Sequence, residues 1–300
     1  MSKTVVVTGS SSGFGRMVSE QLAREGYRVY ATMRDSAGNN ADVRRELLAL
    51  ADAEGLDLRV LDMDVTSTRS VDTAATTVMT ESGAPNVVIN NAGQMYMGLT
   101  EAFSSEEFTR QLDINVVGVH RVNRAFLPEM REHGNGLIIN VSSGAGRIAL
   151  PFFGLYHASK WALEGYTIAL RTELASSGVD MVLIEPGPFA TELFAQTPIP
   201  EDSDGRADTY PPVALQTFEQ MSGAFLKVLE SPHMPSDPGL VVDRMIELIA
   251  MEPGTRPLRS LVGVNFGIEQ LNALAEEHDA GLKESMGMTA FAKLAPRKPH

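Results

Sequence analysis

Cysteine is absent from the 300-residue sequence, and positively charged residues are scarce. Without cysteine the chain cannot form disulfides, use a thiol in catalysis or build a zinc–thiolate site, and its redox compartment is left open. The 25 Lys and Arg residues against 38 Asp and Glu residues give a formal net charge of −13. Because this charge would repel the phosphates of DNA and RNA, we expect no nucleic-acid partner.

Long apolar runs and histidines at metal-ligand spacing are also missing. No run approaches the ~18 apolar residues of a membrane span, so we expect none. The first strand-like run begins at Lys3, which leaves no room for a signal peptide. We therefore expect a cytoplasmic protein that holds no metal ion.

Short β-branched runs alternate with helical patterns along most of the chain. We expect strands over 3–8, 28–33, 57–63, 86–92, 136–142, 179–185 and 257–263, and helices near 14–22, 41–54, 67–82, 105–133, 157–177, 211–230, 238–251 and 266–285. Most of the strands are apolar on successive residues, which is typical of a parallel sheet buried on both faces. The sequence predicts an α/β fold, a Rossmann-type doubly wound parallel sheet. This domain would span 1–265, with 191–239 as a proline-rich lid, and a C-terminal helix and tail would occupy 266–300.

The stretch VVVTGSSSGFG at 5–15 has two interpretations. Gly9 to Gly13 fits G-x-S-x-G, the turn that presents a serine nucleophile in α/β hydrolases, and makes Ser11 a candidate nucleophile. The three glycines also lie between a strand and a helix, where a backbone cradle for phosphates forms. A hydrolase takes oxyanion donors from an earlier strand's loop, and no strand precedes this one. Its position in the chain favours the phosphate cradle.

Tyr156 and Lys160 lie four residues apart in a helical stretch, so their side chains share one face. A nearby ammonium lowers the pKa of a tyrosine from ~10 by ~1–3, which brings the phenol into the range of general acid–base catalysis. A surface Tyr–Lys pair would have the same spacing. More polar motifs stand at or beside expected strand ends, where doubly wound folds bind ligands: NNAG at 90–93, INVVG at 114–118, NVSSGAG at 140–146 and EPGPFAT at 185–191.

Taken in order, these motifs resemble those of the short-chain dehydrogenase/reductase family, T-G-x3-G-x-G, N-N-A-G, Asn, Ser, Y-x-x-x-K and P-G, over residues 4 to about 191. The resemblance implies that Tyr156 is the general acid in reduction and the base in oxidation. Lys160 would lower the pKa of Tyr156 and bind the nicotinamide ribose. Ser143, thirteen residues before the tyrosine, would polarise the substrate carbonyl in preference to Ser142, and Asn115 would organise a proton path beyond the lysine.

The resemblance also implies hydride transfer with a nicotinamide dinucleotide. Its expected binding residues are Gly9, Ser11, Ser12, Gly13, Phe14, Gly15, Arg34, Asp64, Val65, Asn91, Ala92, Gly93, Tyr156, Lys160, Pro186, Gly187, Phe189 and Thr191. An arginine after the second strand pairs the 2′-phosphate of NADP, whereas an acidic residue selects NAD. Arg34 precedes Asp35, so we expect NADP(H) rather than NAD(H), although the two could also form an ordinary solvated charge pair.

Apolar residues occupy positions that line the substrate cleft in the family. With Ser143 and Tyr156, the expected set is Met95, Leu150, Phe152, Phe153 and Phe194, which indicates a small apolar alcohol, ketone or aldehyde. The segments YATMRD and EPGPFATELF resemble sequences of the retinol and 17β-hydroxysteroid dehydrogenase-like branch of the family. The family further implies a homodimer or homotetramer. The alternative is a non-catalytic dinucleotide-sensing regulator, but such proteins typically lose the tyrosine or lysine that this chain retains.

Overall fold

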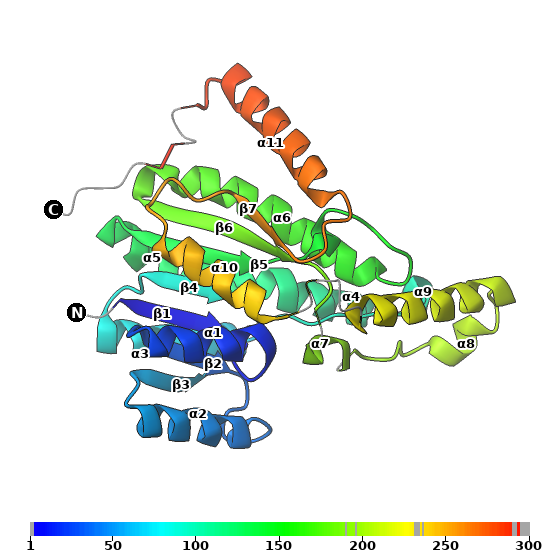
Figure 1. The fold of residues 1–300 in the computed structure, drawn as a ribbon, viewed down its shortest axis with the longest axis horizontal. Coiled ribbons are helices and arrows are strands. Elements are labelled where there is room, and N and C mark those ends of the chain that lie inside the picture. The colour runs from blue at the N-terminus through cyan, green and yellow to red at the C-terminus, as the bar shows by residue number, and fades with distance from the viewer. Residues whose placement is uncertain are drawn as a thin grey trace.

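A parallel sheet with helices on both faces forms the body of the molecule (Figure 1). The computed structural model describes residues 3–189, 191–195, 197–230, 235, 237–289 and 293–294. Within these residues one seven-stranded sheet has the order β3-β2-β1-β4-β5-β6-β7, and each adjacent pair is parallel. The strands are β1 Thr4–Thr8, β2 Arg28–Met33, β3 Leu58–Asp62, β4 Val87–Asn90, β5 Gly136–Val141, β6 Val179–Pro186 and β7 Arg259–Val262. The expected doubly wound fold is confirmed.

The helices follow the strands in alternation until residue 190. The first group is α1 Gly13–Arg24, α2 Ala41–Glu54, α3 Thr68–Ser82, α4 Ser105–Leu112, α5 Gly118–His133 and α6 Gly154–Leu174. The second group is α7 Glu192–Ala195, α8 Ser203–Ala207, α9 Pro212–Glu230, α10 Gly239–Ala250 and α11 Ile268–Ser285. None of the helices in these described ranges is long and apolar enough to cross a membrane.

The central strands are buried on both faces because their side chains alternate between two cores. Val5 and Val7 of β1 pack in a cluster with residues of α1, α2 and α10. Val6 points to the opposite face and packs in a cluster with residues of α3 and α5. All three valines have no exposed surface, which explains why β1 is apolar on successive residues rather than at every second one.

The helical stretch expected over 105–133 is present. A π-helical turn at Asp113–Val117, which the sequence pattern did not predict, joins α4 to α5, and the backbone stays helical on both sides of it. The turn contains Asn115, whose buried side chain is hydrogen-bonded to Gln94 and Ser159. A π turn holds one extra residue per turn, and such turns are frequent at functional sites.

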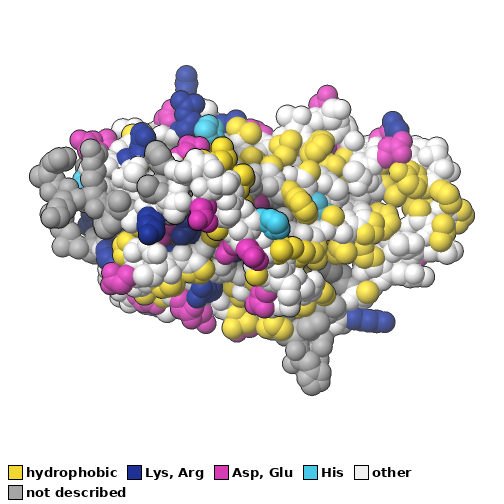
Figure 2. All heavy atoms as spheres, turned by 90° about the horizontal axis from the view of Figure 1, so that it is seen from above, with side chains coloured by type: hydrophobic (Ala, Val, Ile, Leu, Met, Phe, Trp, Pro, Cys, Tyr) yellow, Lys and Arg dark blue, Asp and Glu magenta, His cyan; other side chains and the backbone are white. Residues whose placement is uncertain are grey.

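The segment expected as a lid forms an arm of three helices beyond the carboxyl ends of the strands, towards the right of Figure 1. Phe218 of α9 packs against Phe152, with ring centroids 4.9 Å apart. Hydrophobic side chains gather at the same end of the molecule in Figure 2, where Val213 and Leu215 of α9 are exposed. Helix α11 rises from the edge of the sheet near β7 (Figure 1). A domain boundary at residue 265 remains a prediction.

Candidate active site

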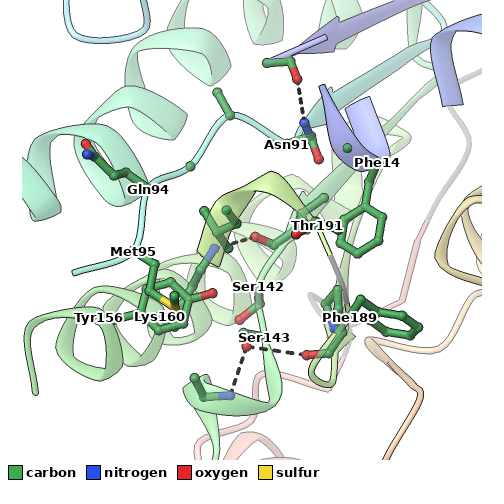
Figure 3. A pocket seen from close by; sticks show the side chains of 18 of the residues that line it. Phe14, Asn91, Gln94, Met95, Ser142, Ser143, Tyr156, Lys160, Phe189 and Thr191 are labelled. Atoms are coloured by element: carbon green, nitrogen blue, oxygen red, sulfur yellow. Dashed lines mark hydrogen bonds between the residues drawn. The ribbon is translucent and has the colours of Figure 1, made fainter. Parts of the chain in front are cut away.

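A cavity of about 320 Å³ opens at the carboxyl ends of the parallel strands (Figure 3). Its wall contains the following residues expected to bind cofactor or substrate: Gly9, Ser11, Ser12, Gly13, Phe14, Arg34, Asp64, Val65, Asn91, Ala92, Gly93, Met95, Ser143, Leu150, Phe153, Tyr156, Lys160, Pro186, Gly187, Phe189 and Thr191. They come from segments more than 180 residues apart in sequence, which the parallel sheet brings to one edge.

Other expected residues lie away from the described wall. Gly15 and Asn115 lie behind it, and Phe152 turns towards Phe218 of α9. The expectation that Phe152 lines the substrate cleft therefore differs from the structure. Its backbone has φ of +69°, a left-handed conformation that residues other than glycine seldom adopt. The side chain of Phe194 lies outside the described residues.

The glycine turn between β1 and α1 brings its backbone unusually close to the loop after β4. Gly9 has φ of +69°, and a Cβ there would lie 2.7 Å from Ala92 Cα. A Cβ on Gly15 would lie 2.3 Å from both Asn91 Nδ2 and Gly9 O. Asn91 fixes this approach, because its Nδ2 donates to Thr8 O and Gly9 O at 3.0 Å each. Only glycine fits such contacts, and the open backbone at the start of α1 suits a pyrophosphate.

The structure does not support the interpretation of Ser11 as the nucleophile of a hydrolase. His157 is the histidine in the described cavity wall. Its Nε2 accepts from Leu150 N at 2.8 Å, and its Nδ1 lies 2.8 Å from Ala145 O. Both ring nitrogens are therefore engaged with the backbone, so this imidazole is not placed to act as the general base of Ser11.

In the loop after β2, Arg34 lines the cavity, whereas the carboxylate of Asp35 is hydrogen-bonded within the loop. The Arg34 side chain is exposed and lines the cavity. Asp35 has φ of +49°, and its Oδ2 accepts from Asn39 N at 2.8 Å. The Arg34 carbonyl accepts from Asn40 Nδ2 at 2.7 Å, which fixes the same turn. The loop thus offers a guanidinium to the cavity and uses the carboxylate for its own structure.

Tyr156 and Lys160 lie one turn apart on α6 and are only 7% and 6% exposed. Lys160 Nζ lies 5.6 Å from the centroid of the Tyr156 ring and donates to Val141 O at 2.8 Å. Burial lowers the pKa of Lys160 to about 8, against the opposing effect of Glu164. The pair expected from the sequence is present, in one buried corner of the cavity.

The pKa of Tyr156 differs from the expectation. Burial raises it to about 12, while the Ser143 hydroxyl has a smaller, opposite effect. We expected the Lys160 ammonium to lower it, but the cost of removing the phenolate from water dominates, and only the Ser143 hydroxyl opposes it. Tyr156 is consequently protonated at neutral pH, as a general acid in reduction must be.

The serine pair after β5 divides between two environments (Figure 3). Ser143 Oγ accepts from Ala145 N at 3.1 Å, donates to Pro186 O at 3.4 Å and interacts with the Tyr156 hydroxyl. Ser142 is buried beside Glu164. Burial raises the pKa of the Glu164 carboxyl, and the Ser142 hydroxyl opposes part of this rise. Ser143 therefore shares the corner with Tyr156, and its choice over Ser142 as the catalytic serine stays a prediction.

Asn115 supports the corner that contains Tyr156 and Lys160 through hydrogen bonds to Gln94 and Ser159. Its Oδ1 accepts from Gln94 N and its Nδ2 donates to Gln94 O, each at 2.9 Å. The same Nδ2 donates to Ser159 Oγ at 3.0 Å. The amide thus joins the loop after β4 to α6, between Tyr156 and Lys160.

The cavity wall also contains residues outside the expected set, some of which lie within the motifs quoted above. They are Thr66, Gln94, Ile114, Ile148, His157, Glu192, Leu193, Val264, Phe266 and Ile268, with Met33, Val141, Ser142, Gly144, Ala145 and Pro188. The group at 264–268 follows β7 and belongs to no motif, so only the path of the chain brings it to the cavity. Within the described residues no cluster of three or more His, Asp and Glu side chains could hold a metal ion.

Comparisons with known proteins agree with this geometry. The family model described as short chain dehydrogenase matches residues 3–202. A 3-ketodihydrosphingosine reductase of Bacteroides thetaiotaomicron is 37% identical over 62% of this chain and 64% of its own length, and so just under two thirds of that relative is matched. Human 17-beta-hydroxysteroid dehydrogenase type 1 is 34% identical over 84% of this chain and 81% of its own length.

Solved structures show the same fold. A short-chain dehydrogenase from Streptomyces avermitilis has a TM-score of 0.73 at 28% identity, covering 97% of this chain and 98% of that one. An actinorhodin polyketide ketoreductase with NADPH has a TM-score of 0.69 at 26% identity, covering 87% and 95%. The chain belongs to the short-chain dehydrogenase/reductase family and is an NAD(P)-dependent oxidoreductase.

Proposed function

We propose that the protein transfers hydride between NADP(H) and an apolar ketone, aldehyde or alcohol, with Tyr156 as the general acid–base group. The observation that carries the proposal is the buried corner in which the hydroxyls of Tyr156 and Ser143 meet beside Lys160. This corner opens into the same cavity as the glycine turn. A bound dinucleotide can thus reach from the phosphate cradle to the reacting hydroxyls.

The nicotinamide, when bound, supplies the hydride that reaches the carbonyl carbon. Tyr156 is protonated at neutral pH and donates its hydroxyl proton to the carbonyl oxygen. Ser143 donates a hydrogen bond to the same oxygen and stabilises the negative charge that develops there. Lys160, with its pKa lowered to about 8, holds the positive charge that stabilises the tyrosinate left behind. Asn115 keeps α6 in register with the loop after β4.

The preference for NADP(H) follows from the loop after β2. Arg34 lines the cavity, and a guanidinium pairs a phosphate through charge-assisted hydrogen bonds. Asp35, the residue that would select the unphosphorylated ribose, already accepts from Asn39 N. The structural relative with NADPH supports the same choice. Ser12 lies in the same wall and can add a hydroxyl contact.

The substrate side of the cavity favours an apolar molecule. Met95, Phe153 and Tyr156 form a buried cluster against which Leu193 and Met221 pack. Methionine side chains adapt to irregular apolar shapes. The reductase and the hydroxysteroid dehydrogenase among the relatives are named for a sphingoid lipid and a steroid, molecules with large hydrocarbon parts, which supports a largely apolar substrate.

Two further expectations remain proposals. The exposed apolar side chains Phe108, Val117 and Trp161 lie on or next to α4, α5 and α6 and suit the packing of subunits in a homodimer or homotetramer. A cytoplasmic location also remains a proposal.

The direct test mixes the purified protein with NADPH and then NADH against apolar ketones, aldehydes and charged keto acids, following absorbance at the nicotinamide wavelength. We expect oxidation of NADPH with apolar carbonyls, and a loss of about 10²- to 10⁴-fold in kcat in Tyr156→Phe with unchanged NADPH binding. Substantial turnover by Tyr156→Phe would refute the role of the tyrosine. Tight NADPH binding with no turnover of any carbonyl would favour the alternative of a dinucleotide-sensing regulator.

A further inference from the structure

Helix α11 contacts the body of the protein through one face of its first turns. Ile268, Asn272 and Glu276 are spaced four residues apart and so lie on the same side of the helix. Ile268 and Asn272 are buried, whereas Leu274 and Leu282 on other faces are 55% and 58% exposed. Figure 1 shows the remainder of α11 rising away from the sheet. The first turns of α11 are therefore attached to the body through a few side chains. Of these, Ile268 lines the cavity and Asn272 contacts Arg147 and Glu185 beside it.

Asn272 bridges the turn after Ser143 and the carboxyl end of β6. Its Oδ1 accepts from Arg147 Nε at 2.7 Å, and its Nδ2 donates to Glu185 Oε2 at 2.5 Å. Arg147 ends the short turn that follows Ser143. Glu185 directly precedes Pro186, whose carbonyl accepts from Ser143 Oγ. One amide, 8% exposed, thus ties together the segment that carries Ser143 and the segment that receives its hydrogen bond.

Two neighbouring contacts support the same junction. A Cβ on Gly144 would lie 2.8 Å from Ile268 Cδ1, so α11 packs directly on the residue after Ser143. Ile268 also lines the cavity. On the other side Arg259 pairs with Glu276 of α11 at 3.1 Å and with the buried Glu164 at 2.9 Å.

We propose that Asn272 is a positioning residue for the reaction, which holds Ser143 and the loop beginning at Pro186 in their working geometry, so that α11 is part of the active site. This inference rests on the proposed function, because it assigns Ser143 to the substrate carbonyl. An asparagine suits the position because it can accept from Arg147 and donate to Glu185 at once. Alanine can do neither, so Arg147 and the buried Glu185 both lose a hydrogen bond, and among the described residues Glu185 keeps only its ion pair with Arg259 at 3.4 Å.

The test compares Asn272→Ala with Leu274→Ala, a control on the exposed side of the same helix. Amide hydrogen exchange over 143–148 and at Glu185 and Gly187, whose neighbours Pro186 and Pro188 carry no amide hydrogen, reports the geometry of the two segments without any substrate. We expect exchange at least about 10-fold faster in Asn272→Ala, and no change in the control. Unchanged exchange in Asn272→Ala would overturn the proposal.

Kinetics separate positioning from general damage. We expect Asn272→Ala to lower kcat by about 10- to 100-fold, because small displacements of a catalytic group are costly, while the KM for NADPH changes less than about threefold. An equal loss in kcat and in NADPH binding, or no loss in kcat, would overturn the assignment. If the wild-type protein neither binds NADPH nor reduces a carbonyl, the proposed function fails, and the exchange comparison still decides whether Asn272 holds the loops.

A second variant, Asn272→Asp, provides a rescue that depends on pH. The new carboxyl would face Glu185 and Arg147, with Glu164, Arg259 and Glu276 in the surrounding cluster. At about pH 6 the two facing carboxyls share a proton, so the new group can donate as the amide does, and activity should approach that of the wild type. At about pH 9 both are ionised and repel each other, and activity should fall to the level of Asn272→Ala. A pH profile parallel to that of the wild type would overturn the proposal.

Discussion

Replacing Lys160 by methionine should change the stability of the protein in a pH-dependent way. The ammonium is 6% exposed, and burial lowers its pKa from 10.5 to about 8. This difference corresponds to about 3 kcal/mol by which folding disfavours the charged form. Lys160→Met removes that cost together with the hydrogen bond to Val141 O.

The sign of the pH dependence follows from the two pKa values. Below about pH 8 the lysine is charged in both the folded and the unfolded chain, so the folded protein bears the whole cost. Above 10.5 it is neutral in both, and the cost vanishes. The free energy of unfolding of Lys160→Met minus that of the wild type should therefore fall by about 3 kcal/mol across this range. The lost hydrogen bond adds an offset that does not vary with pH, and Tyr156 titrates in both proteins.

The assay is urea unfolding of both proteins at about pH 7 and about pH 10.5, with Lys160→Arg as a control that keeps its charge at both values. The two m-values should agree, so that the midpoints can be compared. A difference in stability that stays constant with pH would show that the ammonium is not destabilised by burial and would refute the reasoning. The same variant should lose catalytic activity, because it removes the positive charge proposed to stabilise the tyrosinate.

Three other outcomes are expected. Ser143→Ala should lower kcat by about 10²- to 10³-fold, as the loss of a donor to a developing oxyanion does, whereas Ser142→Ala should lower it far less; rates in the reverse order would contradict the serine assignment. Arg34→Asp should shift the ratio of kcat/KM for NADPH over NADH towards NADH, and an unchanged ratio would exclude Arg34 from the phosphate site. Gly15→Ala should weaken NADPH binding in a fluorescence titration, because its Cβ would lie 2.3 Å from Gly9 O in the cradle; wild-type affinity would contradict a rigid cradle.

The sequence predicted the features that depend on neighbouring residues. Val5 to Val7 are apolar in succession because both faces of β1 are covered, and this pattern is visible without a structure. The same holds for Tyr156 and Lys160, whose spacing on one helix puts them together. The motifs at strand ends were also informative, since a parallel sheet brings those ends to one edge.

Features that depend on distant parts of the chain could not be predicted. Asn272 meets its partners Glu185 and Arg147 across 87 and 125 residues, and no periodicity records such a contact. The predicted direction of the shift in the pKa of Tyr156 was wrong, because the burial that raises this pKa depends on the whole cavity. The contact of Phe152 with Phe218 joins two distant segments, and the positive φ of Phe152 is one that its residue type seldom adopts, so neither was visible in the sequence.

The strand order has a consequence for how the protein can change. Successive strands run outward from β1 to β3 on one side, and from β4 to β7 on the other. The residues proposed to meet the adenosine end of the dinucleotide, such as Arg34 and Asp64, belong to the first half of the chain. Ser143, Tyr156 and the apolar wall, which begins at Met95, come later in the chain. Cofactor choice and substrate choice are thus encoded in separate, contiguous stretches of the gene, so one can be altered by recombination or design while the other is inherited intact.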